Sequence, residues 1–281
     1  MFQGRVPQSE WTRMRCPFQE GDFPGPVKYG YINVGRVLDG PAALQGRDVF
    51  CLYPHQTLYT VPESAVTPLP DGIPAARAVL AANMETAVNV LWDAAPSVGD
   101  KISVIGGGVL GSLIAYLANR LPGTEVQIVD PDDGKENIYQ SIGLNFCDPD
   151  QALGERDIVI HTSATQDGLR RCLTLARNEG RIIEASWYGD REVSLPLGQD
   201  FHSRRLQLIG SQVGMVSPSK RSTHSYADRL SLALSLLSDP ALDALFTHEI
   251  DFDDLPDRMP DFVANGSGVA CVRIRYPDTV D

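Results

Sequence analysis

The chain is short of cysteine, of positive charge and of long apolar segments. Its 281 residues include five cysteines, and none stands in a C-x-x-C pair. Scattered thiols in odd number predict neither a disulfide framework nor a cysteine-rich metal cluster, and they favour a reducing compartment. No apolar run approaches the ~20 residues of a membrane-spanning helix, and the first residues lack the apolar core of a signal peptide. We therefore expect a cytoplasmic protein with no membrane partner.

Negative charge is in excess. The sequence has 36 Asp and Glu against 24 Lys and Arg, for a formal net charge of -12. Nucleic acids and anionic membranes need a positive footprint, so the charge argues against both as partners. A small-molecule substrate remains compatible with this charge, because one basic pocket can lie within an acidic surface. The apolar fraction of 43% is typical of a globular chain with a core of its own.

Up to about residue 75 the chain is rich in Gly and Pro and carries short β-prone runs. The runs at 31–38, 48–52 and 57–61 are separated by turn residues, a pattern typical of a small β-barrel or sandwich. From 74 to 94 apolar residues recur at helical spacing, and Pro74 is placed to start the helix.

From residue 100 the pattern becomes an alternation of strands and helices. This alternation predicts a doubly wound parallel sheet with helices on both faces, the Rossmann arrangement of the α/β class. A further amphipathic helix and a closing strand follow at 226–237 and 269–276. The expected strands lie at 101–105, 125–129, 157–160, 181–185 and 206–209, and the expected helices at 110–120, 136–142 and 167–177.

A G-x-G-x-x-G motif stands between the first of these strands and its helix. Gly106, Gly108 and Gly111 supply the three glycines, and Val109 and Leu110 complete the turn. The first glycine allows a tight turn, the second allows a pyrophosphate to approach, and the third allows helix and strand to pack closely. Free amide groups at the helix N-terminus would bind the phosphates. The context predicts a dinucleotide-binding site.

Asp130 ends the second strand, where an acidic residue is expected to bind the ribose. Its carboxylate accepts from the ribose 2′-hydroxyl and repels a 2′-phosphate, and no Arg follows at once. NAD(H) is therefore the preferred cofactor, with NADP(H) as the alternative. Lys135 either reaches across the adenosine or is a solvated loop lysine.

Several stretches together resemble the medium-chain dehydrogenase/reductase superfamily, whose members are alcohol dehydrogenase-like. They are GYINVGRV, GRDVFCLYPHQTLYTVPE, the helix before GGGVLG, FHSRRLQLIGS and the C-terminal return. The resemblance implies a GroES-like β-barrel domain at 1–82 and 211–281, shortened at its N-terminus, and a Rossmann domain at 83–210. It also implies hydride transfer to or from a nicotinamide, a small-molecule substrate between the domains, and a homodimer through the edge strand.

The resemblance fails at the metal ligands. Tyr31 and Ile32 stand where zinc-dependent members have a His ligand and a Glu, and Ala82 stands where they have a Cys. The four-cysteine lobe of a structural zinc is also missing. A phenol, an alkyl chain and a methyl group do not make the N/S/O site that catalytic zinc needs, so we expect no zinc. Members also have a further segment before the point matching Met1. Either a barrel strand is absent here or the sequence begins late.

Without a metal, the candidates for polarising a carbonyl are hydrogen-bond donors. Tyr31 is either such a donor or a packed barrel residue. Tyr53 and His55 lie on a loop that by resemblance lines the substrate pocket, although a loop His is often only a surface residue. Glu85 either faces the cleft or makes a buried structural hydrogen bond. By resemblance, cofactor contacts also come from Thr86, Thr162, Ser163, Ala185 and Ser186.

The sequence thus favours a zinc-independent NAD(P)-dependent oxidoreductase that interconverts an alcohol and a carbonyl on a small to medium polar substrate. Two alternatives stay open. One is an enoyl or quinone reductase of the same fold, which delivers hydride to a C=C bond and needs less acid assistance at oxygen. The other is a catalytically silent nucleotide-binding protein that senses or scaffolds, in keeping with the lost metal ligands.

Overall fold

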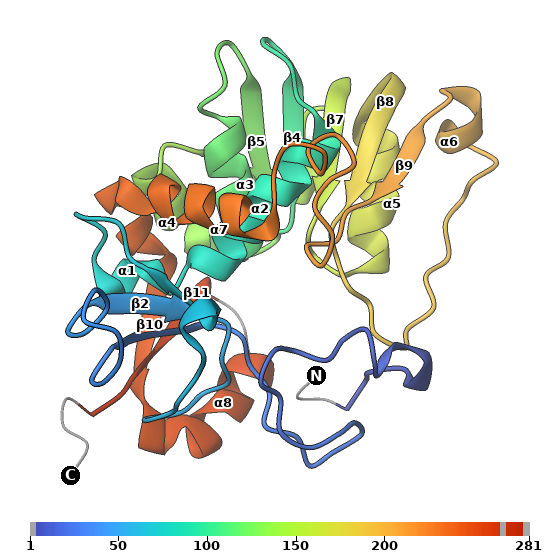
Figure 1. The fold of residues 1–281 in the computed structure, drawn as a ribbon. Helices are drawn as coiled ribbons and strands as arrows, with labels where there is room; N and C mark the ends of the chain where they lie inside the picture. Colours follow the sequence, from blue (N-terminus) through green and yellow to red (C-terminus); the bar gives the residue numbers. More distant parts are fainter. Residues whose placement is uncertain (1–3, 265–267, 278–281) are drawn as a thin grey trace.

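The computed structural model describes residues 4–264 and 268–277. A parallel sheet covered by helices forms one part of the molecule, and a smaller β-rich part lies below it in Figure 1. Among the described residues no helix is long and apolar enough to cross a membrane.

The six-stranded sheet is parallel throughout, in the order β6-β5-β4-β7-β8-β9. The order reverses between β4 and β7, and this switch point is where open α/β sheets bind ligands beyond the carboxyl ends of their strands. The expected doubly wound sheet is confirmed. Its strands are β4 (Lys101–Ile105), β5 (Glu125–Val129), β6 (Asn145–Cys147), β7 (Arg156–His161), β8 (Ala176–Glu184) and β9 (Gln207–Gly210).

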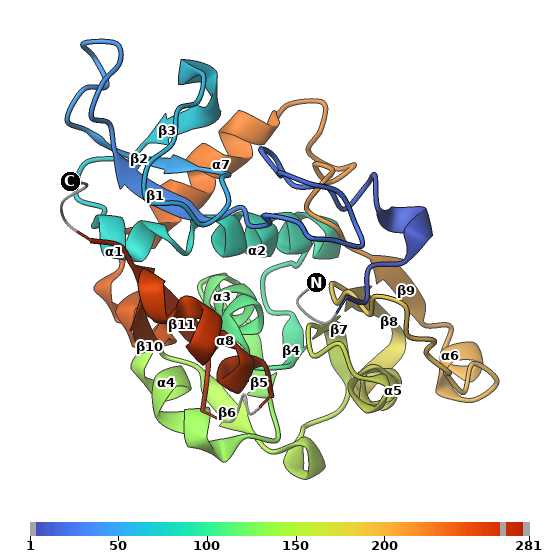
Figure 2. The same ribbon diagram turned by 90° about the horizontal axis from the view of Figure 1, so that it is seen from below.

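Helices cover both faces because apolar side chains alternate along the strands. In β7, Ile158 and Ile160 join the core that contains α3, whereas Val159 joins the core that contains α5. Figure 2 shows α5 on the opposite side of the sheet from α2, α3 and α7. The helices are α2 (Ala81–Ala94), α3 (Val109–Ala118), α4 (Glu136–Ser141), α5 (Gln166–Leu175), α6 (Asp200–Ser203) and α7 (Tyr226–Ser235).

The β-rich part contains an antiparallel sheet in the order β1-β2-β3 and a parallel pair, β10 and β11. The strands are β1 (Asn33–Arg36), β2 (Asp48–Cys51), β3 (Val66–Pro68), β10 (Phe246–Asp251) and β11 (Cys271–Arg275), with helices α1 (Ala75–Ala78) and α8 (Leu255–Ala264). Short 3₁₀ turns occupy Gln8–Glu10, Glu63–Ala65, Asp133–Lys135, Pro149–Gln151, Leu236–Ser238, Pro240–Leu245 and Phe252–Asp254.

Three local expectations are wrong. Residues 57–61 form no strand, and β2 pairs instead with Val66–Pro68. The helix expected over 74–94 is two helices, because the amide of Leu80 bonds the Arg77 carbonyl and tightens the turn between them. The helix expected over 167–177 ends at Leu175, and the next strand begins at once.

The two-domain division stays a prediction. A boundary between residues 82 and 83 would cut α2 just after it begins, and the main apolar core runs from Phe50 of β2 through α2 to Leu234 of α7.

Candidate functional site

The glycine-rich turn connects β4 to α3 at the switch point of the sheet. Gly106 has a φ of +104°, and a Cβ there would lie 2.7 Å from the Ser163 backbone nitrogen. A Cβ on Gly111 would overlap the carbonyl oxygen of Gly106. Both positions therefore exclude a side chain. Gly108 differs, because in the described part of the chain no atom beyond its direct neighbours lies within 4 Å of its Cβ position.

The space beside Gly108 adjoins the N-terminus of α3. Gly108 is the N-cap residue, and it supplies no side-chain hydrogen bond to the helix. The first amides of a helix have no partner within the helix, so those of Val109 and Leu110 are available to an anion and carry the positive end of the helix dipole. With no side chain in the way, this turn fits the pyrophosphate of a dinucleotide.

Asp130 lies beside this turn at the end of β5. Its Oδ2 accepts from the Gly107 amide at 2.6 Å, and its Oδ1 accepts from the Asp132 amide at 2.9 Å and from Lys135 Nζ at 3.1 Å. The Tyr139 hydroxyl donates to the Gly107 carbonyl at 2.9 Å and holds the turn from the other side. A carboxylate has about four lone-pair sites, so these bonds leave room for a ribose hydroxyl. Lys135 is buried in the ion pair rather than solvated.

The end of β7 closes the other side of the switch point. The Thr162 hydroxyl donates to the carbonyls of Ile105 and Gly106, at 3.1 and 2.8 Å. Because Gly106 also lies against the Ser163 backbone, the segment after β7 contacts the glycine turn directly. The structure therefore brings Thr162 and Ser163 to the nucleotide turn.

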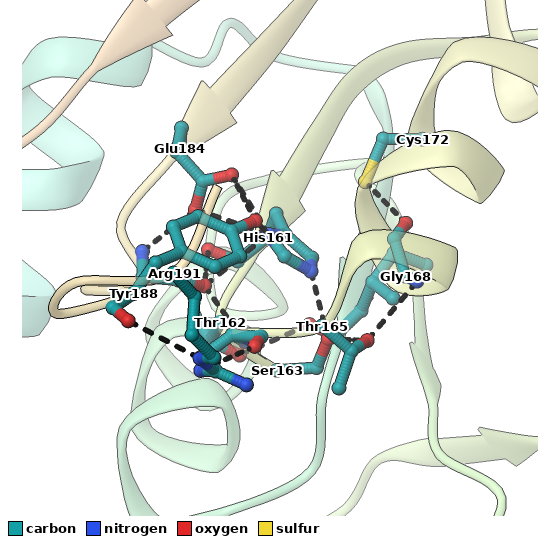
Figure 3. Close-up of polar contacts among 12 residues, drawn as sticks. His161, Thr162, Ser163, Thr165, Gly168, Cys172, Glu184, Tyr188 and Arg191 are labelled. Atoms are coloured by element: carbon teal, nitrogen blue, oxygen red, sulfur yellow. Dashed lines mark hydrogen bonds and ion pairs between the residues drawn. The ribbon is translucent and has the colours of Figure 1, made fainter. Parts of the chain in front are cut away.

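A buried polar network lies immediately behind Ser163, as Figure 3 shows. The His161 ring is fully buried; its Nδ1 is 2.9 Å from Glu184 Oε2, and its Nε2 is 2.7 Å from Ser163 Oγ. His161 and Glu184 are paired residues at the ends of β7 and β8. The hydroxyl of Tyr188 donates to Glu184 at 3.0 Å, and the amide of Ser186 donates to it at 2.7 Å.

The network keeps Glu184 ionised. Burial alone would raise the pKa of Glu184, but the hydrogen bonds from His161, Ser186 and Tyr188 outweigh it and lower that pKa. Burial and the neighbouring carboxylate raise the pKa of Tyr188 above its ordinary value, so this phenol stays a donor. The amide of Ala185 donates a hydrogen bond to the carbonyl of His161 at 3.0 Å.

His161 and Glu184 were not among the candidate site residues predicted from the sequence. A single His after an apolar strand is most often a core residue, and a Glu 23 positions later gives no local pattern. The available signal was that both residues end neighbouring parallel strands, whose carboxyl ends meet at one edge of the sheet.

The candidates in the β-rich part lie in adjoining segments. A Cβ on Gly30 would lie 3.1 Å from Pro54 Cα, so the chain before Tyr31 runs against the loop that carries His55. The Nδ1 of His55 is 2.7 Å from the Tyr276 hydroxyl, and burial lowers the pKa of His55. Tyr53 stacks on the ring of Tyr59 at 3.9 Å between centroids. Tyr31 itself is 45% exposed.

Glu85 is held in a buried ion pair. Its Oε1 accepts from Arg229 Nε at 3.1 Å, and Arg229 also donates to Asn89 at 2.6 Å and to the Val213 carbonyl at 2.7 Å. This is the structural alternative that the sequence left open for Glu85. The Thr86 hydroxyl bonds the Ala82 carbonyl within its own helix at 2.9 Å. Arg229 was not anticipated, because nothing local links it to residue 85.

The described residues contain no group of three or more His, Cys, Asp or Glu side chains arranged to hold a metal ion. The position that resembles a Cys ligand is the buried methyl group of Ala82.

Comparison with known proteins gives one curated relative and many similar folds. No family model matches the chain. A 2-dehydro-3-deoxy-L-galactonate 5-dehydrogenase from Pseudoalteromonas atlantica is 24% identical over 169 residues, which cover 56% of this chain and 49% of the relative. The match thus spans about half the length of that relative.

Two solved structures show the same architecture over most of the chain. An L-idonate 5-dehydrogenase from Escherichia coli has a TM-score of 0.72 at 16% identity, covering 87% of this chain and 80% of its own. The yhfP protein of Bacillus subtilis, with NAD bound, has a TM-score of 0.65 at 16% identity, covering 88% and 80%. This likeness confirms the fold expected from the sequence, that of the medium-chain, alcohol dehydrogenase-like proteins, and the antiparallel sheet fits its GroES-like part.

Proposed function

We propose that this protein, with the alcohol dehydrogenase-like fold as its framework, is a NAD(P)(H)-dependent oxidoreductase that interconverts an alcohol and a carbonyl. The observation that carries the proposal is the free approach to the N-terminus of α3 at Gly108, with Asp130 beside it. A bound nicotinamide cofactor would supply the acceptor or donor of hydride. The chain's own residues bind its phosphates and ribose and supply hydrogen-bond donors for the carbonyl oxygen.

The preferred cofactor is NAD(H). Asp130 presents a carboxylate where a 2′-phosphate would otherwise lie, and Lys135, the nearest cation, is already paired with that carboxylate. NADP(H) is the alternative.

The reaction is proposed to proceed without zinc. The residues at the positions that resemble metal ligands, Tyr31, Ile32 and Ala82, offer one phenol and no nitrogen or sulfur donor. Tyr31 and His55 are the proposed groups at the substrate oxygen, with Tyr53 beside them. Support for a small polar substrate comes from the sugar acids in the names of the relative and of the E. coli structure.

The direct test is a bulky substitution at Gly108. Gly108→Val should leave the fold intact, because the position is open and has a φ of -68° that any residue adopts. The added methyl groups would occupy the approach to the α3 amides, so NADH affinity should fall by about 10²-fold or more, in keeping with losing charge-assisted hydrogen bonds. Fluorescence titration with NADH measures binding. A panel of alcohols, carbonyls and enones measures turnover.

Gly198→Val is the matched control, because Gly198 is also open and lies in the loop after β8, away from the turn. The control should bind NADH like the natural protein. Equal NADH affinity for Gly108→Val and the control would contradict the proposed site. NADH binding without turnover of any compound in the panel would favour the catalytically silent alternative.

A further inference from the structure

The hydrogen bonds around Ser163 form a chain with a single direction. At one end the Gly168 amide can only donate, and it gives its hydrogen to Thr165 Oγ1 at 3.1 Å. At the other end the Glu184 carboxylate can only accept, so in the neutral form of the His161 ring the hydrogen is on Nδ1. The Nε2 of His161 must then accept from the hydroxyl of Ser163 at 2.7 Å, and Ser163 accepts from Thr165 at 2.9 Å.

This direction commits the Ser163 proton to the buried ring. One lone pair of Ser163 Oγ accepts from Thr165 (Figure 3). No further donor among the described residues bonds this oxygen, so its second lone pair is open to a donor on a ligand. Ser163 is half-buried and lies against Gly106 at the switch point, whereas His161 is fully buried. Among the described residues, the only hydroxyl bonded to His161 Nε2 is therefore one that borders the glycine turn.

The first turn of α5 is shaped around this contact. A Cβ on Gly168 would overlap Ser163 Oγ and lie 2.7 Å from His161 Nε2. Gly168 thus keeps the helix close enough to exclude water from the Ser163–His161 bond. A proton on the ring can then leave most directly through Ser163.

We propose that Glu184, His161 and Ser163 form a proton relay, in which Ser163 accepts the proton of a hydroxyl group on the ligand bound at the switch point. The relay rests on the proposed oxidoreductase function. A bound nicotinamide cofactor would take up the hydride of the alcohol carbon, and Ser163 Oγ would receive the hydroxyl proton. The proton of Ser163 passes to His161 Nε2, and the imidazolium is balanced by the Glu184 carboxylate. Carbonyl reduction runs the same steps in reverse.

Four groups define the charge around the ring. Glu184 and Tyr188 contact it from β8 and the loop that follows. Cys172 of α5 interacts electrostatically with Glu184 and Tyr188, and the guanidinium of Arg191 lies 5.8 Å from the centroid of the Tyr188 ring. Burial raises the pKa of Cys172, so that thiol stays neutral. Glu184 is therefore the one anion in contact with His161 in this set.

Protonation of His161 should reverse the chain. The imidazolium donates from Nε2 to Ser163, and the ligand hydroxyl then competes with the Thr165 hydroxyl for the one lone pair that remains on Ser163 Oγ. Since the ligand hydroxyl binds better to the uncharged form of the network, NADH binding should be accompanied by proton release. The loss of one hydrogen bond should weaken binding about three- to tenfold on the acidic side.

The test is calorimetric titration of the full chain with NADH, in two buffers of different ionisation enthalpy, across about pH 5.5–8.5. The natural protein should release a proton on the acidic side, whereas His161→Gln and Ser163→Ala should exchange none. Ser163→Ala buries no new charge, so it keeps the test valid if His161→Gln does not fold. Ser163→Thr, which keeps the hydroxyl, should restore the proton exchange.

Thr162→Val is the matched control, because its hydroxyl bonds only backbone carbonyls of the turn. It should weaken NADH binding equally at every pH and leave the proton release unchanged. NADH binding with the same proton exchange in Ser163→Ala as in the natural protein would overturn the relay alone. Absence of NADH binding to the natural protein at any pH would overturn the oxidoreductase function, and the relay with it.

Discussion

The segments that carry Tyr31 and His55 lie close together because Gly30, which precedes Tyr31, has no side chain. Gly30 has a φ of +151° and lies against Pro54 and His55, so a larger residue there would push the two segments apart. Desolvation, with the nearby Cys16 thiol, raises the pKa of Tyr31, and burial lowers the pKa of His55. At neutral pH the phenol is therefore a donor and the imidazole is uncharged, which suits hydrogen bonding to a carbonyl oxygen.

Replacing the Tyr31 hydroxyl tests whether it serves the carbonyl. In Tyr31→Phe, kcat for alcohol and carbonyl substrates should fall about 10²-fold or more, because the loss of one hydrogen-bond donor to a developing oxyanion is typically of this size. The kcat of His55→Ala should also fall, and NADH affinity should not change in either variant. Steady-state kinetics with NADH or NAD⁺ provides the measurement.

Tyr29→Phe is the control, since its phenol is already bonded to the Met14 carbonyl at 3.1 Å. If Tyr31→Phe and His55→Ala reduce enones at the natural rate and the natural protein prefers enones, the C=C reductase alternative is correct and Tyr31 is a packing residue.

At this scale the sequence predicts the residues that belong to a local motif and misses those joined through space. Gly106, Gly108 and Asp130 are found because strand, turn and acid follow at fixed spacing. His161 and Glu184 meet only because β7 and β8 pair in register. Glu85 is recognised as unusual from its apolar surroundings, but its partner Arg229 lies 144 positions away.

Individual elements were predictable where the hydrophobic period was strong. The strands Lys101–Ile105 and Glu125–Val129 are found with their exact bounds, because each is an apolar run between turn residues. The strands Asn145–Cys147 and Phe246–Asp251 were missed, because they are short or half-exposed, whereas Cys271–Arg275 lies within the closing strand expected at 269–276.

Helices α2 and α7 are joined by one buried charge pair. Arg229 is 2% exposed and bonds Glu85, Asn89 and two carbonyls of the segment after β9. Arg229 therefore fixes α7, α2 and the chain at Val213–Met215 relative to one another. Removing one partner would leave the other charge buried and unpaired.

Arg229→Leu should lower the free energy of unfolding by about 3–5 kcal/mol, the usual effect of breaking a buried pair. Glu85→Leu with Arg229→Leu should cost less than the sum of the single changes, because no buried charge remains. Urea denaturation of the four proteins gives the coupling energy. Additive costs would show that Glu85 and Arg229 do not depend on one another, and would reopen a role for Glu85 in catalysis.

The same pair has a pH signature. Burial raises the pKa of Glu85 above its ordinary value of 4.5, and Arg229 only partly opposes this. Between 4.5 and the raised pKa the folded protein binds more protons than the unfolded chain, so this contribution to stability is present below 4.5 and is lost as pH rises through the folded pKa. Glu85→Gln should abolish that part of the pH dependence of the free energy of unfolding.

In the whole molecule, the carboxyl edge of the parallel sheet faces the β-rich part and the N-terminal segment. The loop after β8 runs down to that segment in Figure 1, and a Cβ on Gly189 would lie 2.6 Å from the Arg5 carbonyl oxygen. The glycine turn, the His161 network and the Tyr31–His55 segments therefore belong to one side of the sheet. The sequence predicts this assembly only through its resemblance to a known fold, because composition and period carry no information about how two parts meet.

The edge of the sheet leads to a prediction about assembly. Strand β9 (Gln207–Gly210) has a neighbour on one side only, and Leu208 on it is 40% exposed. An unpaired edge strand is a template for pairing with another chain, and here no proline and no charge on the strand blunts it. We expect a homodimer formed edge to edge through β9, with a mass by light scattering twice the 30.6 kDa of one chain.

Leu208→Lys should give the single-chain mass, because two like charges would face each other across the dyad. Leu197→Lys, at an exposed leucine outside β9, should remain dimeric. A single-chain mass for the natural protein would reject the dimer, and loss of the dimer in both variants would move the interface away from β9.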